Sequence, residues 1–215
     1  MKINSAGGNV KDVEKEPIPQ KSTTRNLILL ICFDCLLVSM TIFFAMLYRS
    51  FGQAWMLSSY VTFLTVTYHF VMRLMVGQTV SMIYKNREFR MDSLGFRMHS
   101  FEPELYRKLK VKKWKANMIT AKPEQFDLKK NNLESLLHNM AQAEFVHRVI
   151  MVLSFLPLLL IIPYGAPVVF IVTSVLACLI DLQFVIIQRY NRPRVERLLE
   201  MTKKRKNNNS FSTDV

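Results

Sequence analysis

The segment Gln188-Arg189-Tyr190-Asn191-Arg192-Pro193-Arg194 places three arginines directly after an apolar stretch, Val168 to Ile187. A guanidinium group is poorly suited to the core of a bilayer but well suited to its interface, where it contacts phosphates and carboxylates at two points. A stop signal of positive charges is the simpler interpretation. Such a signal needs no interleaved Gln, Tyr, Asn and Pro, and we therefore favour a functional site here.

A carboxylate and an imidazole stand three residues apart, at Glu144 and His147, just before the next apolar stretch begins. Residues at this spacing share one side of a helix. A histidine at a partly dehydrated interface suits general-base catalysis, in which it takes the proton of a hydroxyl that attacks an acyl carbonyl. We predict His147 as this base and Glu144 as the group that orients its ring. The alternative for His147 is a packing histidine at the interface.

The segment 188–194 would complete such a site. Its arginines are suited to the phosphates of a donor such as acyl-CoA, or to a phospholipid headgroup. Its neutral side chains are suited to donate hydrogen bonds to the oxyanion that develops during acyl transfer. The residues of this segment that we predict to bind substrate or donor are Gln188, Arg189, Tyr190, Asn191, Arg192 and Arg194.

Asp181 lies seven residues before Gln188, which is two helical turns deeper in the same apolar stretch. An uncompensated carboxylate at that depth costs a few kcal/mol. We therefore expect Asp181 to pair with an arginine such as Arg73, to bond to His69, or to stay protonated. A structural ion pair is favoured over a catalytic acid, and Asp181 joins the candidate site residues.

Hydrophobic residues make up 50% of the 215 residues and are collected into blocks of about 20 residues, a length typical of membrane-spanning helices. Leu27 to Tyr48 and Trp55 to Val76 predict one hairpin, with a turn around Gly52. Val149 to Gln188 is long enough for two further spans, with a turn at 163–167. The predicted fold is an all-α membrane protein with about four transmembrane helices and additional interfacial amphipathic helices.

The polar residues between these blocks complete the predicted organisation. Two basic amphipathic helices are expected at about Glu102 to Met118 and Asn131 to Val146, where they would lie on a membrane surface. Nearly all of the 29 Lys and Arg then fall on one side, which predicts a plasma-membrane protein with both termini cytoplasmic. The expected regions are a disordered tail (1–25), a first hairpin (26–83), a basic cytoplasmic or interfacial segment (84–147), a second hairpin (148–194) and a basic tail, disordered from Met201 (195–215).

Several other functions are poorly supported by the composition. The net charge of +13 comes without any nucleic-acid-reading motif, so we expect no nucleic-acid partner. The four histidines lack the spacing of metal ligands, and we predict no metal site. The three cysteines lie inside apolar stretches, where packing is favoured over redox chemistry.

The string QRYNRPR, with Ala143-Glu144-Phe145-Val146-His147 and Val111-Lys112-Lys113-Trp114-Lys115, resembles the glycosyl-4,4'-diaponeurosporenoate acyltransferase family. These are small membrane enzymes of staphyloxanthin-type carotenoid synthesis. The matching segments extend from about Tyr84 to Met201, and they add Trp114 and Lys115 to the candidate binding residues. No catalytic assignment comes with the resemblance, so the predicted roles rest on the chemistry above.

The predicted function is that of a membrane-embedded O-acyltransferase. It would esterify a sugar hydroxyl of a lipid-linked glycoside, such as a glycosyl carotenoid, with a fatty acyl group at the cytoplasmic face. The expected donor is acyl-CoA or an acyl-carrier thioester, no bound cofactor is expected, and membrane lipids and the lipid-linked acceptor are the partners. The alternative is a non-enzymatic membrane scaffold or anionic-lipid-binding subunit, and the oligomeric state stays open.

Overall fold

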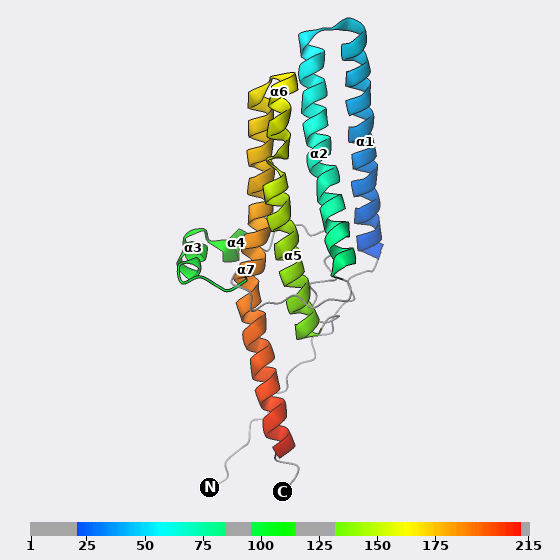
Figure 1. Cartoon of the computed structure of the whole chain (residues 1–215). Coiled ribbons are helices and arrows are strands. Elements are labelled where there is room, and N and C mark those ends of the chain that lie inside the picture. The colour runs from blue at the N-terminus through cyan, green and yellow to red at the C-terminus, as the bar shows by residue number, and fades with distance from the viewer. Residues whose placement is uncertain (1–20, 85–95, 115–131, 212–215) are drawn as a thin grey trace, which may run out of the picture.

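The computed structural model describes residues 21–84, 96–114 and 132–211 of the chain. All secondary structure in these residues is helical, as the sequence predicts. Figure 1 shows the long helices side by side, with the short helices α3 and α4 beside α7. The elements are α1 (Lys21–Phe51), α2 (Ala54–Ile83), α3 (Glu102–Lys108), α4 (Val111–Trp114), α5 (Leu133–Leu153), the 3-10 helix η3 (Leu156–Leu160), α6 (Ile161–Tyr164) and α7 (Pro167–Phe211).

The first predicted hairpin is present as α1 and α2. The chain reverses at Gly52, which has a φ of 65°, a left-handed conformation that glycine adopts without steric cost. The two helices are held along their length by a 2.9 Å hydrogen bond between the hydroxyls of Thr41 and Thr67 and by stacking of Phe44 on Phe63. Both helices run beyond the predicted spans, and α1 already begins within the tail predicted as disordered.

The second hairpin is formed by α5 and α7, joined by η3 and α6. The amphipathic helix predicted from 131 to 146 is not separate from the third span, because α5 continues through both. Asn132 caps its first turn by accepting the Ser135 N–H at 2.6 Å. The helix ends at Leu153, four residues before Pro157, whose ring would clash with the carbonyl at that distance in a continuing helix.

The carboxy-terminal tail is helical, so the prediction of disorder from Met201 is wrong for the described residues. α7 continues through Pro193 to Phe211. Its extension repeats apolar residues at helical spacing, and Val195 and Leu199 pack against the start of α5 at Leu136, Leu137 and Met140. An ion pair between Lys203 and Glu134, 2.8 Å long, joins the same two helices. Tertiary contacts therefore stabilise a helix that composition alone does not favour.

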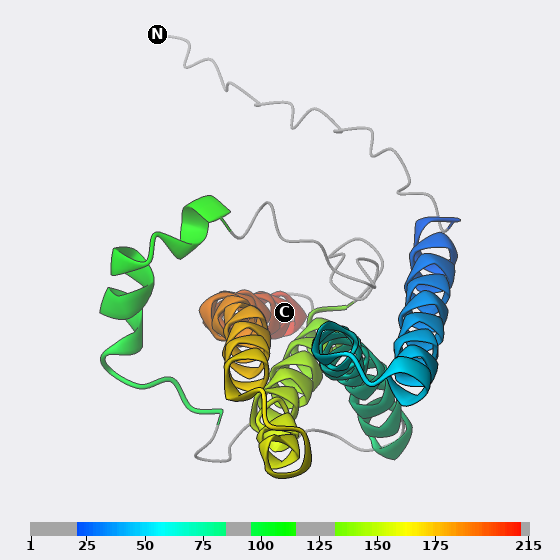
Figure 2. The ribbon, with the colours of Figure 1, turned by 90° about the horizontal axis from the view of Figure 1, so that it is seen from above.

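The segment from 96 to 114 lies on the side of α7 opposite to the α1–α2 hairpin, as Figures 1 and 2 show. The single helix predicted from 102 to 118 is wrong, because α3 ends at Lys108 and α4 begins only at Val111. Lys110 between them has a φ of 51°, which interrupts the helix. The part of that prediction beyond Trp114 lies outside the described residues.

Three segments of the described chain are long and apolar enough to cross a membrane: Ile28–Phe51, Leu133–Tyr164 and Pro167–Arg205. The remaining long helix, α2, has 30 residues and is not among these segments, and it carries Tyr68, His69 and Arg73. At 1.5 Å per residue it measures about 45 Å, longer than a hydrocarbon layer of about 30 Å. The protein is thus an all-α membrane protein, and the predicted count of about four spans is approximate.

Candidate active site

Glu144 on α5 is the centre of a group of buried charges. Its side chain is fully buried, and its carboxylate accepts hydrogen bonds from three arginines. One oxygen accepts from Arg148 at 2.5 Å and from Arg189 at 2.9 Å, and the other accepts from Arg192 at 2.8 Å. We call Glu102, Glu144, Arg148, Arg189 and Arg192 the boundary cluster, because it lies where the apolar part of α7 gives way to polar sequence.

The second carboxylate of the boundary cluster comes from α3. Glu102 is buried and accepts from Arg189 with both oxygens, one of them from Nε at 3.0 Å. It also accepts from the Tyr106 hydroxyl at 2.5 Å and from the His99 N–H at 3.1 Å. Burial acts to raise the pKa of Glu102, but these hydrogen bonds outweigh it and hold the pKa below its ordinary value. Burial and the bond to Glu102 raise the pKa of Tyr106.

The other donors of the two buried arginines hold the backbone before α3. Arg189 donates to the Arg97 carbonyl at 2.9 Å, and Arg192 donates to the Phe96 carbonyl. The Arg192 guanidinium also lies 5.4 Å from the centre of the Phe96 ring. Arg189 and Arg192 were predicted to bind substrate or donor. In the structure they contact the protein's own carboxylates and carbonyls instead, and both side chains are buried.

The remaining predicted binding residues are spread over α4 and α7. Gln188 is buried, Asn191 is half-buried, and Tyr190 packs edge-on against Tyr106 with 5.8 Å between the ring centres. Arg194 is exposed, and its guanidinium lies 4.0 Å from the centre of the Tyr190 ring. On α4, the Trp114 indole donates to the Leu109 carbonyl at 3.0 Å. Lys115 lies outside the described residues.

Asp181 on α7 joins two other helices. Its side chain is fully buried, and one oxygen accepts from Arg73 on α2 at 2.5 Å. The other oxygen lies 2.8 Å from Nδ1 of His147 on α5. The expected ion pair with Arg73 is therefore present in the structure, whereas no bond to His69 is formed, since neither ring nitrogen of His69 has a partner among the described residues. We call Arg73, His147 and Asp181 the inner cluster.

The group that orients His147 is Asp181, and the prediction that Glu144 does so is wrong. Glu144 shares a helix side with His147, but arginines occupy both of its oxygens. The packing of α5 against α7 brings Asp181 to Nδ1 instead, and the imidazole stacks on Phe184 with 4.5 Å between the ring centres. The ring is therefore fixed on two sides, by a hydrogen bond and by an aromatic face.

The inner cluster has the chemical capacity of a base. An ionised carboxylate only accepts hydrogen bonds, so Asp181 favours the tautomer of His147 that carries its proton on Nδ1. The lone pair then lies on Nε2, which no side chain of the described residues contacts by a hydrogen bond. The His147 side chain is 22% exposed, so the ring is held by Asp181 but is not fully enclosed by the protein.

Sequence reasoning missed Glu102 and underestimated Arg73. Glu102 follows no recognisable motif, and its partner Arg189 lies 87 residues further along the chain. Arg73 was expected as one possible partner of Asp181 and was not placed among the candidate site residues. Its position within an apolar helix is the signal that marks it, because an arginine at such depth requires a partner.

The sequence model of the glycosyl-4,4'-diaponeurosporenoate acyltransferase family matches residues 82–201. The matched residues hold the boundary cluster, His147 and Asp181, whereas α1 and most of α2, with Arg73, lie outside them. Comparison of the chain with curated proteins and with solved structures gives no match. Since the family model covers more than half of the chain, the protein belongs to the glycosyl-4,4'-diaponeurosporenoate acyltransferase family and is an acyltransferase.

Proposed function

We propose that the protein transfers a fatty acyl group from a thioester to a sugar hydroxyl of a membrane-borne glycoside, with His147 as the general base. The family acts on glycosyl carotenoids by its name, and a glycosyl carotenoid is the acceptor we propose. The observation that carries the proposal is the inner cluster, in which a buried carboxylate fixes a partly exposed imidazole. Membership of an acyltransferase family favours an enzyme over the alternative of a membrane scaffold.

The proposed reaction has two proton transfers. Nε2 of His147 takes the proton of the acceptor hydroxyl as its oxygen attacks the thioester carbonyl carbon. The tetrahedral intermediate then collapses, the carbon–sulfur bond breaks, and the imidazolium returns the proton to the leaving thiolate. The products are an ester and a free thiol. Asp181 holds the ring and stabilises the imidazolium between the two transfers, while Arg73 fixes the position of Asp181.

The proposed donor is acyl-CoA or an acyl-carrier thioester, and no bound cofactor is needed for this reaction. Because buried carboxylates occupy Arg189 and Arg192, we assign the donor phosphates to the exposed Arg194. Its guanidinium is oriented by the Tyr190 ring and hydroxyl, at 2.5 Å from the latter, and stands beyond the apolar part of α7. Arginine is suited to this contact because it binds phosphate oxygens at two points.

The reaction is proposed to occur at the cytoplasmic face of the plasma membrane. Support comes from the excess of Lys and Arg outside the apolar stretches, which favours the cytoplasmic side. Both donors are cytoplasmic molecules, so the same side would supply the acyl group. Cysteine-accessibility labelling at residues 112 and 205 in intact and permeabilised cells tests this orientation, and labelling of either position in intact cells would contradict it.

The test is turnover by the purified full chain in lipid nanodiscs, given acyl-CoA and a glycosylated carotenoid. The release of free thiol and the mass of the ester report the two products separately. We expect His147→Ala to lower turnover by about 10²- to 10⁴-fold, the usual contribution of a general base. His138→Ala, a histidine on the same helix outside both clusters, is the matched control and is expected to keep turnover. Wild-type-like turnover of His147→Ala would overturn the assignment of the base.

A further inference from the structure

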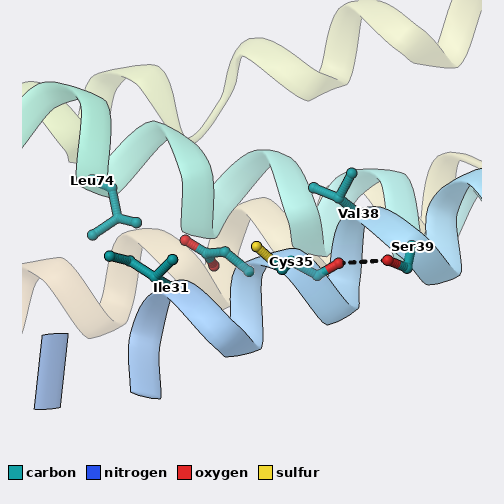
Figure 3. Close-up of a pocket in the computed structure, with 6 residues that line it drawn as sticks. Ile31, Cys35, Val38, Ser39 and Leu74 are labelled. Atoms are coloured by element: carbon teal, nitrogen blue, oxygen red, sulfur yellow. Dashed lines mark hydrogen bonds between the residues drawn. The ribbon is translucent and has the colours of Figure 1, made fainter. Parts of the chain in front are cut away.

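Exposed apolar side chains occur in two settings in this protein. Most of them lie on stretches that are long and apolar enough to cross a membrane, where lipid chains cover them. Figure 3 shows one such place, a groove of about 370 Å³ that side chains of α1 and α2 line. A smaller group, which includes Phe101, Leu105 and Leu109, belongs to the polar segment 96–114 beside α7. None of the membrane-length stretches of the described chain contains these residues, so their exposure has a different cause.

Phe101, Leu105 and Leu109 follow one another at intervals of four residues along α3. The Leu105 N–H donates to the Phe101 carbonyl at 3.1 Å, and the Leu109 N–H donates to the Leu105 carbonyl at 2.9 Å. This is the hydrogen-bond pattern of an α-helix, so the three side chains lie above one another on a single side of α3. They are 62%, 39% and 43% exposed, respectively. We call these three residues the α3 stripe.

The neighbouring side of α3 holds the helix against α7. Glu102 and Tyr106 are buried there, and each directly follows a residue of the α3 stripe in the sequence. Glu102 accepts hydrogen bonds from Arg189, and the Tyr106 ring packs against the Tyr190 ring. The orientation of α3 about its own axis is therefore fixed by contacts with α7, and these contacts leave the α3 stripe uncovered.

The sequence of α7 sets the level of α3 in a membrane. The apolar stretch Val168 to Ile187 measures about 30 Å at 1.5 Å per residue, which is the thickness of a hydrocarbon layer. Arg189, the partner of Glu102, is the second residue after this stretch, so α3 lies at the boundary between hydrocarbon and headgroups. Figure 1 shows α3 at about the height of the lower ends of α1 and α2, and Figure 2 shows it to one side of α7, away from both. A helix that projects sideways at this level lies among lipid headgroups.

Basic side chains accompany the α3 stripe. Every Lys and Arg of the segment 96–114 is exposed: Arg97, Arg107, Lys108, Lys110, Lys112 and Lys113. Of the two acidic residues, Glu102 is bound by Arg189, and Glu104 pairs with Arg107 and Lys108 at 3.9 and 3.2 Å. Exposed Phe and Leu on one side of a helix, with an excess of Lys and Arg beside them, are typical of a helix that lies in the interface of an anionic leaflet.

A protein partner fits the α3 stripe less well than a lipid surface does. A stable protein interface buries about 800 Å² from some 20–30 residues on each side. The α3 stripe offers three apolar side chains, and the residues around it are mostly charged. Three apolar side chains are sufficient for shallow insertion into a leaflet, because the rest of the protein already holds α3 at that level.

We propose that the α3 stripe inserts among the acyl chains just below the headgroups of the leaflet at this end of α7, and that the neighbouring Lys and Arg contact anionic lipid phosphates. The partner is a bilayer surface that contains anionic glycerophospholipid. This contact does not depend on acyl transfer at His147. Because Glu102 joins α3 to Arg189, the same contact ties the boundary cluster to the membrane surface.

Spin labels at single cysteines of the full chain in lipid nanodiscs test the insertion, after the three native cysteines are replaced by serine. Leu105→Cys carries the label on the α3 stripe, and Glu104→Cys, the preceding residue, is the matched control on the charged side. Power-saturation EPR compares the collisions of each label with oxygen, which concentrates in hydrocarbon, and with a water-soluble nickel chelate. We expect oxygen to dominate at position 105 and nickel to dominate at position 104. Equal nickel accessibility at the two positions would overturn the proposal.

The same label distinguishes a lipid surface from a second copy of the chain. A label at position 105 that is shielded from both reagents lies against protein. Dipolar broadening that grows with the number of chains per nanodisc would identify that protein as a second copy. Either result would overturn the proposal. We expect no such broadening, and an oxygen accessibility at position 105 that is independent of the number of chains.

The contact with anionic lipid is tested by the composition of the nanodisc. We expect the label at position 105 to lie deeper in discs that contain phosphatidylglycerol than in discs of phosphatidylcholine alone. The difference should disappear in the double variant Lys108→Glu with Lys112→Glu. It should persist in Lys204→Glu with Arg205→Glu, a matched pair of exposed cations near the end of α7. Equal depth in the two kinds of disc, or an equal loss in both double variants, would overturn the assignment of anionic lipid.

Discussion

The boundary cluster and the inner cluster lie along the same two helices, α5 and α7, but use their charges differently. In the boundary cluster, three arginines surround two buried carboxylates, and their hydrogen bonds join α3, α5 and α7. In the inner cluster, one carboxylate holds an arginine with one oxygen and an imidazole with the other. The imidazole keeps a second nitrogen for chemistry. The fully paired charges of the boundary cluster stabilise the fold. The His147 imidazole, which has one nitrogen without a side-chain partner among the described residues, is the candidate catalyst.

The largest effect is expected from Asp181→Asn in the inner cluster. The amide group can donate to Nδ1 of His147, which places the ring proton on Nε2 and removes the base. Turnover should fall by about 10²- to 10⁴-fold. Free-thiol release in nanodiscs measures this loss. Unchanged turnover would show that the inner cluster is only structural.

Glu144→Ala should produce the opposite pattern, with the main loss in stability. It removes the carboxylate that three arginines share and takes a charged partner from the buried guanidinium groups of Arg189 and Arg192. Removing one partner of a buried ion pair costs about 3–5 kcal/mol. Denaturant-induced unfolding in mixed micelles measures this difference, with His147→Ala as the comparison that should keep most of the stability. A Glu144→Ala variant as stable as the wild type would break the distinction between the two clusters.

The pH dependence of stability tests whether the charge of Glu102 stabilises the fold. Its pKa is lowered in the folded protein, so its contribution is present above the ordinary value of 4.5 and is lost as the pH falls below it. The wild-type Tm should therefore fall more steeply than that of Glu102→Gln as the pH is lowered below about 4.5. At neutral pH, Glu102→Gln should cost about 1–3 kcal/mol, since Arg189 loses a charged partner.

Glu104 on the same helix provides the control for this measurement. Its side chain is largely exposed and pairs only with the neighbouring Arg107 and Lys108 among the described residues. Exposed pairs contribute little, so Glu104→Gln should change stability by less than about 0.5 kcal/mol at any of these pH values. Parallel pH profiles of Glu102→Gln and the wild type would contradict the role given to Glu102.

The smallest effect is expected from Arg194→Ala. Its side chain is exposed, so stability should change by less than about 0.5 kcal/mol. If Arg194 contacts the donor phosphates as proposed, KM for acyl-CoA should rise about tenfold with little change in kcat, because loss of binding that is equal in ground state and transition state raises KM alone. An unchanged KM would remove Arg194 from the donor site and leave the inner cluster unaffected.

Much of the fold follows from the apolar stretches. Their length predicts the two hairpins, and Gly52 marks the first reversal. The errors lie where helices are stabilised or interrupted by contacts. The tail after Met201 is helical because the preceding turns of α7 pack on α5, and Lys110 divides a helix that periodicity alone would continue.

The sequence by itself determined that polar groups gather at the ends of the α5–α7 hairpin and that Asp181 needs a partner such as Arg73, because burial of a lone charge is costly wherever it occurs. Only the tertiary structure decided which carboxylate serves which cation. Helical spacing places Glu144 and His147 on one side of α5. The packing of α5 against α7, however, places Glu144 in contact with Arg189 and Arg192, and His147 in contact with Asp181. These bonds join residues 34 to 48 positions apart, a separation at which side-chain pairing depends on how the helices pack.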